Sequence, residues 1–168
     1  MPVSLDFSSL DLMDALDLAI LIEVEAWERY QEFAKQIGYR RPGDAASIFH
    51  TMAGNEEKHG HQLSERRQEL FGNKPLRVNR DAIFDVEAPD AGAPRWNMSP
   101  LQAFQVALES EEKAFWFYDE ALKHVTDPSI IELFTELRDE EKEHVQMVKE
   151  AIAGLPPGSD EELENLDD

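Results

Sequence analysis

Two glutamate–histidine pairs with identical spacing are the residues of this sequence best suited to chemistry. Glu56 precedes His59 and Glu141 precedes His144, each time by three positions in a segment with helical periodicity. Residues at i and i+3 lie on one face of a helix about one turn apart, so both side chains of a pair can reach one metal ion. One such pair is a weak signal in an acidic chain, and the inference of a metal site depends on its repetition.

Two further glutamates belong to a second repeated motif, Glu-x-x-Ala-x-x-x-Tyr. The motif runs from Glu23 to Tyr30 and recurs from Glu111 to Tyr118. The two motif glutamates are 88 residues apart, and the members of the two glutamate–histidine pairs are 85 residues apart. The chain therefore reads as two similar halves.

All six of these acidic and imidazole side chains interrupt an apolar stripe near the middle of a predicted helix. They are Glu23, Glu56, His59, Glu111, Glu141 and His144. Residues on the stripe point at the core, where an isolated carboxylate costs several kcal/mol unless it is neutralised, paired or coordinated. No lysine or arginine occupies the stripe at that level, so cations are the natural partners. Four carboxylates balance two divalent ions. Oxygen-rich ligation with one imidazole per metal favours iron or manganese, although zinc or copper could bind by affinity.

Two assignments have alternatives. Glu140 lies four residues before His144 and competes with Glu141, but the matching place in the other half is Asn55, which favours Glu141. Tyr30 and Tyr118 could donate hydrogen bonds to carboxylates of the facing helix, and a role as core aromatics fits equally well. Glutamates off the stripe are expected at the surface: Glu25, Glu28, Glu57, Glu112 and Glu140.

Four predicted helices position these residues. They cover about residues 10–37, 44–71, 99–125 and 127–154. Helix-stop glycines, Ser99 before a proline, and Asp127 before a proline mark their ends. Short joins make two antiparallel hairpins, and the proline-containing stretch 73–98 is expected to be a long crossover. The fold class is therefore all-α, a four-helix bundle of two hairpins. We expect one domain over residues 1–154 and an acidic, disordered tail over 155–168.

Composition excludes several functions. The 168 residues include 36 Asp and Glu, 16 Lys and Arg, and no cysteine, giving a formal net charge of −20. The charge argues against nucleic acid or an anionic membrane as a partner. Without cysteine there is no disulfide, thiol nucleophile, iron–sulfur cluster or thiolate zinc site. No apolar stretch is long enough to span a bilayer, and the acidic start lacks the pattern of a signal peptide, so a cytoplasmic protein is expected.

Three segments resemble a known family. The sequences EEKAFWFY at 111–118, EEKEH at 140–144 and NEEKH at 55–59 are similar to those of rubrerythrin-type members of the ferritin-like superfamily. The resemblance covers about residues 10–153 and implies a ferritin-like bundle with a non-haem di-iron site. It implies that the six stripe residues are the iron ligands, with Glu56 and Glu141 bridging. The chemistry of the ligand set leaves Mn or Zn as possible substitutes. The resemblance also implies an oxidoreductase of the ferroxidase or peroxidase type, acting on iron with O2 or H2O2.

The sequence departs from that family in two ways. Rubrerythrins carry a four-cysteine rubredoxin domain that supplies electrons, so this chain would need an external donor. They also have a glutamate where this chain has Ala114. A more symmetric six-ligand site follows, which favours ferrous-iron oxidation or iron handling over efficient H2O2 reduction. The alternatives are a non-catalytic iron-binding or delivery module, and an interaction protein with a structural metal site. A homodimer could form through Trp116 and neighbouring aromatics, but the sequence fixes no stoichiometry.

Overall fold

The computed structural model describes residues 6–37, 45–78, 95 and 97–159. A short 3-10 turn, η1 (Phe7–Ser9), precedes four long helices, whose ends agree with the predicted ones to within three residues. The helices are α1 (Leu12–Ile37), α2 (Ala45–Phe71), α3 (Pro100–Leu122) and α4 (Pro128–Ala153). The join at residues 38–44, most of the predicted crossover and residues 160–168 of the predicted tail lie outside the described residues.

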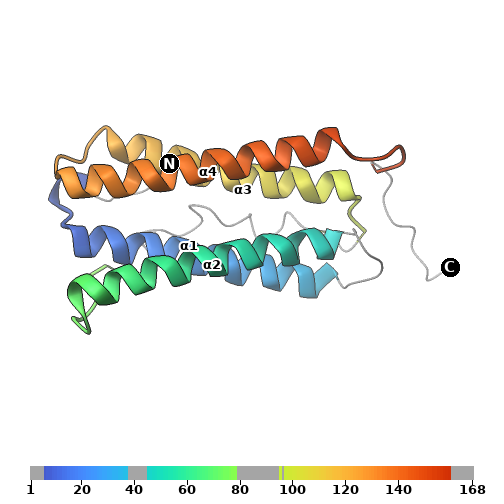
Figure 1. Ribbon diagram of the computed structural model, residues 1–168. Coiled ribbons are helices and arrows are strands. Elements are labelled where there is room, and N and C mark those ends of the chain that lie inside the picture. The colour runs from blue at the N-terminus through green and yellow to red at the C-terminus, as the bar shows by residue number, and fades with distance from the viewer. Residues whose placement is uncertain (1–5, 38–44, 79–94, 96, 160–168) are drawn as a thin grey trace.

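The four helices form a bundle of two hairpins. Helices α1 and α2 pack antiparallel as one pair, and α3 and α4 pack antiparallel as the other (Figure 1). Helices α2 and α3 run in the same direction, which is what a crossover of the bundle's full length produces. The prediction of an all-α bundle of two hairpins joined by a long connection is confirmed.

The predicted helix signals act as expected where they are described. Ser99 and Gln102 form a capping box, in which Ser99 Oγ accepts from the Gln102 N–H at 3.1 Å and Gln102 Oε1 accepts from the Ser99 N–H at 3.0 Å. Asp127 caps α4 by accepting from the Ser129 N–H at 2.8 Å. Gly72 follows α2 with a φ of +60°, a left-handed conformation that glycine adopts without strain.

The residues just after α4 return to the start of α3. The Leu101 N–H donates to the Ser159 carbonyl at 3.0 Å, which satisfies one of the backbone donors left open at a helix N-terminus. The predicted tail therefore makes at least one ordered contact in its first residues. Its predicted disorder beyond Ser159 lies outside the described residues.

Two apolar clusters fill the bundle, one toward each end. Each contains a buried tyrosine packed on a phenylalanine: Tyr30 on Phe49 at 5.9 Å between ring centroids, and Tyr118 on Phe134 at 5.5 Å. We name them the Tyr30 cluster and the Tyr118 cluster. The two tyrosines are 88 residues apart and the two phenylalanines are 85 residues apart, which are the same separations as in the repeated polar motifs. The internal repeat therefore extends from the polar motifs to the packing around them.

Helix α1 is buried more widely than a single stripe predicts. Thirteen of its 26 residues are buried, and among them is Glu25, which is only 5% exposed. The prediction that Glu25 lies at the surface is wrong, because it shares a face with the buried Leu18 and Ile22. On α2 the apolar side chain of Leu70 is 53% exposed near the helix end.

A buried ion pair ties the two helices of the first hairpin together near the Tyr118 cluster. Arg67 Nε and one Nη donate to the two carboxylate oxygens of Asp17 at 2.8 and 3.2 Å. The same guanidinium donates to the carbonyls of Gly72 and Lys74, both at 2.6 Å. One arginine thus satisfies a buried carboxylate and secures the chain where it leaves α2.

Among the described residues, no helix is both long and apolar enough to cross a bilayer.

The aromatic residues of α3 differ in exposure. Phe117 is buried, whereas Trp116 is 60% exposed and meets the Phe115 ring edge-on, with 5.3 Å between the ring centroids. The homodimer expected through Trp116 stays a prediction.

Candidate metal centre

The six stripe residues come from all four helices and meet at one level between the two apolar clusters. Helix α1 supplies Glu23 and α3 supplies Glu111, while α2 and α4 each supply a glutamate–histidine pair. Each pair stays on one helical face because its members are three residues apart. The antiparallel packing of each hairpin then brings the pair opposite the single glutamate.

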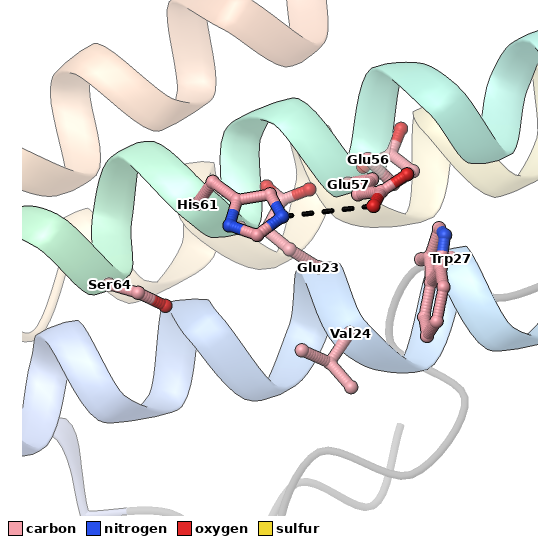
Figure 2. Close-up of a pocket in the computed structure, with 8 residues that line it drawn as sticks. Glu23, Val24, Trp27, Glu56, Glu57, His61 and Ser64 are labelled. Atoms are coloured by element: carbon pink, nitrogen blue, oxygen red, sulfur yellow. Dashed lines mark ion pairs between the residues drawn. The ribbon is translucent and has the colours of Figure 1, made fainter.

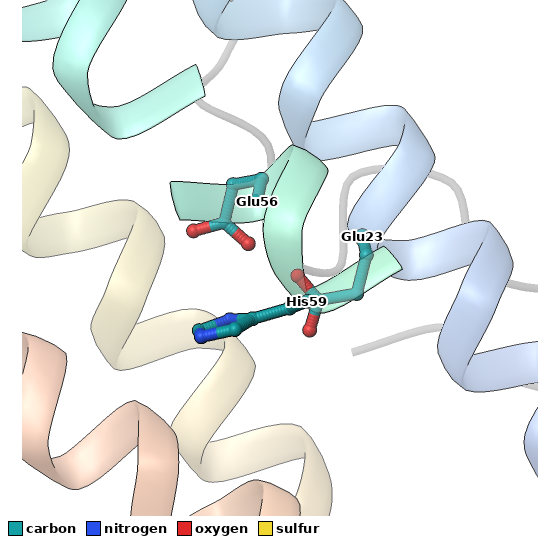
Figure 3. Close-up of side chains that lie close together, drawn as sticks. All are labelled: Glu23, Glu56 and His59. Carbon is teal, nitrogen blue, oxygen red and sulfur yellow. The ribbon is translucent and has the colours of Figure 1, made fainter. Parts of the chain in front are cut away.

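Two sets of three side chains are close enough to hold an ion. Ligand atoms of Glu23, Glu56 and His59 lie within 4.8 Å of one another (Figure 3), and so do ligand atoms of Glu56, Glu111 and His144. Glu56 belongs to both sets. Two neighbouring positions that share a carboxylate are the arrangement of a dinuclear metal site.

Glu141 completes the second set. Its Oε2 lies 3.5 Å from His144 Nδ1, and Glu111 Oε2 lies 3.4 Å from the same nitrogen. Glu141 is 1% exposed, whereas its rival Glu140 is partly exposed. The structure therefore brings Glu141 rather than Glu140 into the cluster.

The acidic groups of the cluster are buried. Glu23, Glu56 and Glu111 have no exposed surface. Neither oxygen of Glu23, Glu111 or Glu141 has a hydrogen-bond partner of standard geometry among the described residues. Buried carboxylates left in this state are strongly unfavourable, and divalent cations would satisfy them. The donor set of four carboxylates and two imidazoles fits a dinuclear metal site.

The pKa values of Glu23, Glu141 and His144 are all raised, because the buried carboxylates have too little positive charge around them. Burial raises the pKa of Glu23 to about 7. Burial, together with the charge of Glu111, raises the pKa of Glu141 well above its usual range. Burial alone would lower the pKa of His144, but the carboxylates of Glu111 and Glu141 outweigh it and raise that pKa to about 11. Protons thus take the place of cations in the metal-free cluster.

The two motif tyrosines lie outside the cluster of ligand atoms. Tyr30 and Tyr118 are fully buried, each within its own apolar cluster. Their predicted role as donors to the carboxylates stays a prediction. The other three histidines, His50, His61 and His124, are exposed.

One feature escaped the sequence analysis. A cavity of about 330 Å3 lies between α1 and α2 and reaches Glu23 and Glu56 (Figure 2). The buried Gly60 lines it. The signal in the sequence is Gly60 one position after the predicted ligand His59, since glycine within a helix is less stable than alanine.

The family model for rubrerythrin matches residues 14–152, with a second match over 102–165. Among solved structures, the chain is similar to an uncharacterized conserved protein from Magnetospirillum magnetotacticum MS-1. The two are 28% identical with a TM-score of 0.70, over 88% of this chain and 97% of that one. No curated protein matches the chain significantly.

Two more distant structures share the fold. Bacterioferritin from Rhodobacter capsulatus, solved with a metal-free dinuclear site and a haem iron, is 19% identical with a TM-score of 0.54, over 84% of this chain and 82% of that one. A dodecameric thioferritin from Bacteroides fragilis is 21% identical with a TM-score of 0.54, over 84% of each chain. The ferritin-like bundle, the buried cluster of glutamate and histidine, and a family-model match over most of the sequence agree: the chain belongs to the rubrerythrin family.

Proposed function

We propose that this protein is a non-haem di-iron protein that binds two iron ions in the carboxylate cluster and oxidises ferrous iron with O2 or H2O2. The observation that carries the proposal is the position of Glu56, which is shared by two sets of ligand atoms in a fully buried acidic cluster. A structural site for one ion would not need a second complete set.

The ligands divide between the two ions by helix pair. Glu23, Glu56 and His59 would hold one ion, and Glu111, Glu141 and His144 the other. Glu56 and Glu141 would each help to hold both ions, and the presence of Glu56 in both sets of ligand atoms supports this for Glu56. A bound pair of ferrous ions would supply two electrons to an oxidant.

The protein's own contribution is charge balance, apolar packing and proton storage. The Tyr30 and Tyr118 clusters close the site toward both ends of the bundle. The carboxyl group of Glu23, with its pKa near 7, can release a proton when a cation arrives and accept one when it leaves. Because the chain has no cysteine, an external donor would have to supply the electrons for any reduction of the centre.

Aerobic addition of two equivalents of Fe(II) to metal-free protein tests the proposal. We expect near-ultraviolet ferric absorbance to grow much faster than in buffer alone, and to reach its plateau at two iron ions per chain. Slow oxidation at the rate of free iron would contradict an oxidoreductase. Tight binding of two ions without fast oxidation would instead favour the second candidate, an iron-binding or delivery module, which the same ligands support.

A third candidate is an interaction protein whose metal site is structural. It requires the fold to depend on the metal. Metal-free protein that keeps a folded, cooperatively melting bundle would exclude it, because loading would then add only the stability that any ligand of the folded state supplies.

A further inference from the structure

The cavity between α1 and α2 connects the surface with the candidate metal centre. Its floor is formed by Glu23 and Glu56, which have no exposed surface. Glu57 and His61 stand at its mouth, with side chains 53% and 74% exposed and 3.7 Å between Glu57 Oε1 and His61 Nε2 (Figure 2). Val24, Trp27, Gly60 and Ser64 complete the wall.

Gly60 keeps the passage open. It is buried on α2 directly opposite α1, and a Cβ built there would meet only the Cβ of Glu23, at 3.7 Å. An alanine would therefore fit without strain, but a branched side chain would extend into the cavity. Glycine in a helix interior costs about 0.5–1 kcal/mol relative to alanine, so packing of α2 alone does not explain this residue.

The lining of the cavity suits a cation. It contains three glutamates and no lysine or arginine. The oxygens of Glu23 at the floor have no hydrogen-bond partner of standard geometry among the described residues. A cation that reaches the floor therefore meets buried carboxylate oxygens, while an anion meets three acidic side chains and no lysine or arginine.

The second hairpin has the same candidate ligands but a different outer face. An offset of 85 residues places Lys142, Val145, Gln146 and Lys149 where the first hairpin has Glu57, Gly60, His61 and Ser64. Lys142 and Lys149 are exposed. Two positive charges and a branched side chain thus replace the acidic mouth and the glycine. The ligands do not require this difference, since they are the same in both halves.

We propose that the cavity is the port through which divalent cations reach the carboxylate cluster, with Glu57 and His61 as the first contact and Gly60 as the opening. This proposal rests on the proposed function, because the port serves the metal centre. Glu23 and Glu56 close the inner end, so a cation passes when one of these side chains moves.

Uptake of Co(II) by metal-free protein, followed by stopped-flow absorbance, tests the port without any redox step. We expect Gly60→Val to slow uptake at least tenfold and to leave the final amount of bound Co(II) unchanged. The matched control is Val145→Leu, which enlarges the equivalent residue of the second hairpin and should leave the rate unchanged. A Gly60→Val protein that fills as fast as the wild type would overturn the proposal, and so would one that loses capacity.

Variants at the exposed mouth give an independent test, because they cannot disturb the core. Glu57→Gln combined with His61→Asn should slow uptake severalfold, and the slowing should shrink at high salt as charge steering is screened. Lys142→Gln combined with Gln146→Asn is the control and should not slow it. Equal rates in the two double variants would contradict the port. Wild-type protein that binds no Co(II) would instead refute the metal centre itself.

Discussion

The imidazole rings of His59 and His144 are stacked in parallel, with centroids 4.8 Å apart and 1° between their planes. They come from different hairpins and occupy equivalent places in the internal repeat. Their surroundings nevertheless shift the pKa values of the two rings in opposite directions. Burial and the nearby His144 lower the pKa of His59 to about 4, while that of His144 is raised to about 11. A histidine must be neutral to bind a metal, so we expect loading of the site to release a proton from His144.

The ligand assignment predicts selective loss of metal. Glu111→Ala and Glu141→Ala should each lose at least one bound ion per chain, because each removes a buried carboxylate next to His144. Glu140→Ala is the control, since Glu140 is partly exposed beside the cluster, and it should keep the wild-type metal content. Elemental analysis after loading and desalting measures all three. Unchanged content in both test variants would refute the assignment.

Replacing Glu23 should have opposite effects on metal-free and loaded protein. Because the folded-state pKa of Glu23 is raised to about 7, its contribution to stability is fully present below pH 4.5 and is lost as pH rises through 7. At pH 8 the metal-free Glu23→Gln variant should therefore be more stable than wild type, on the order of 1–3 kcal/mol, and at pH 5 the gain should be smaller.

With saturating metal the order at pH 8 should reverse, because the variant has lost a ligand and gains less from binding. Thermal unfolding with and without metal checks both signs. A variant less stable than wild type in both states would mean that Glu23 stabilises the fold through contacts other than a metal.

The two buried tyrosines offer a test of their role beside the site. If Tyr30 and Tyr118 hydroxyls orient the carboxylates, each Tyr→Phe variant should weaken metal binding about 10-fold or more. Competition with a chelator of known affinity measures the change. Phe49→Leu and Phe134→Leu are controls, because they alter the ring partners of the tyrosines and leave the hydroxyls in place. Unchanged affinity in both Tyr→Phe variants would leave the tyrosines as core aromatics.

The Asp17–Arg67 pair should be important for the stability of the first hairpin. Asp17→Ala leaves a guanidinium without its buried carboxylate, and removal of one partner of a buried pair is strongly destabilising. We expect the melting temperature to fall by several degrees. Glu136→Ala breaks the more exposed pair with Arg66 and should change it little. An equal fall in melting temperature for the two substitutions would contradict the claim that the buried pair stabilises the protein more than the exposed pair.

Much of the fold follows from local signals in the sequence. Ser99 with Gln102, Asp127, and Gly72 fix helix ends through short-range hydrogen bonds and backbone conformation, and these interactions depend on neighbouring residues alone. The six-residue cluster was predictable because polar residues that interrupt an apolar stripe at matching positions must meet in a symmetric bundle.

Other features depend on how the helices pack against one another, and the apolar stripe of a single helix does not predict them. Glu25 is buried because α1 is covered over more than one face. Leu70 is exposed because α2 ends beside it. The pairing of Asp17 with Arg67 joins residues 50 positions apart, and the cavity at Gly60 depends on how closely α1 approaches α2. None of these follows from the period of a single helix.

The most direct test of the central claim is the number of ions bound. Metal-free protein titrated with Fe(II) under anaerobic conditions should bind two ions per chain with a sharp end point, as two adjacent ligand sets sharing Glu56 require. Binding of one ion, or weak binding without an end point, would contradict a dinuclear centre.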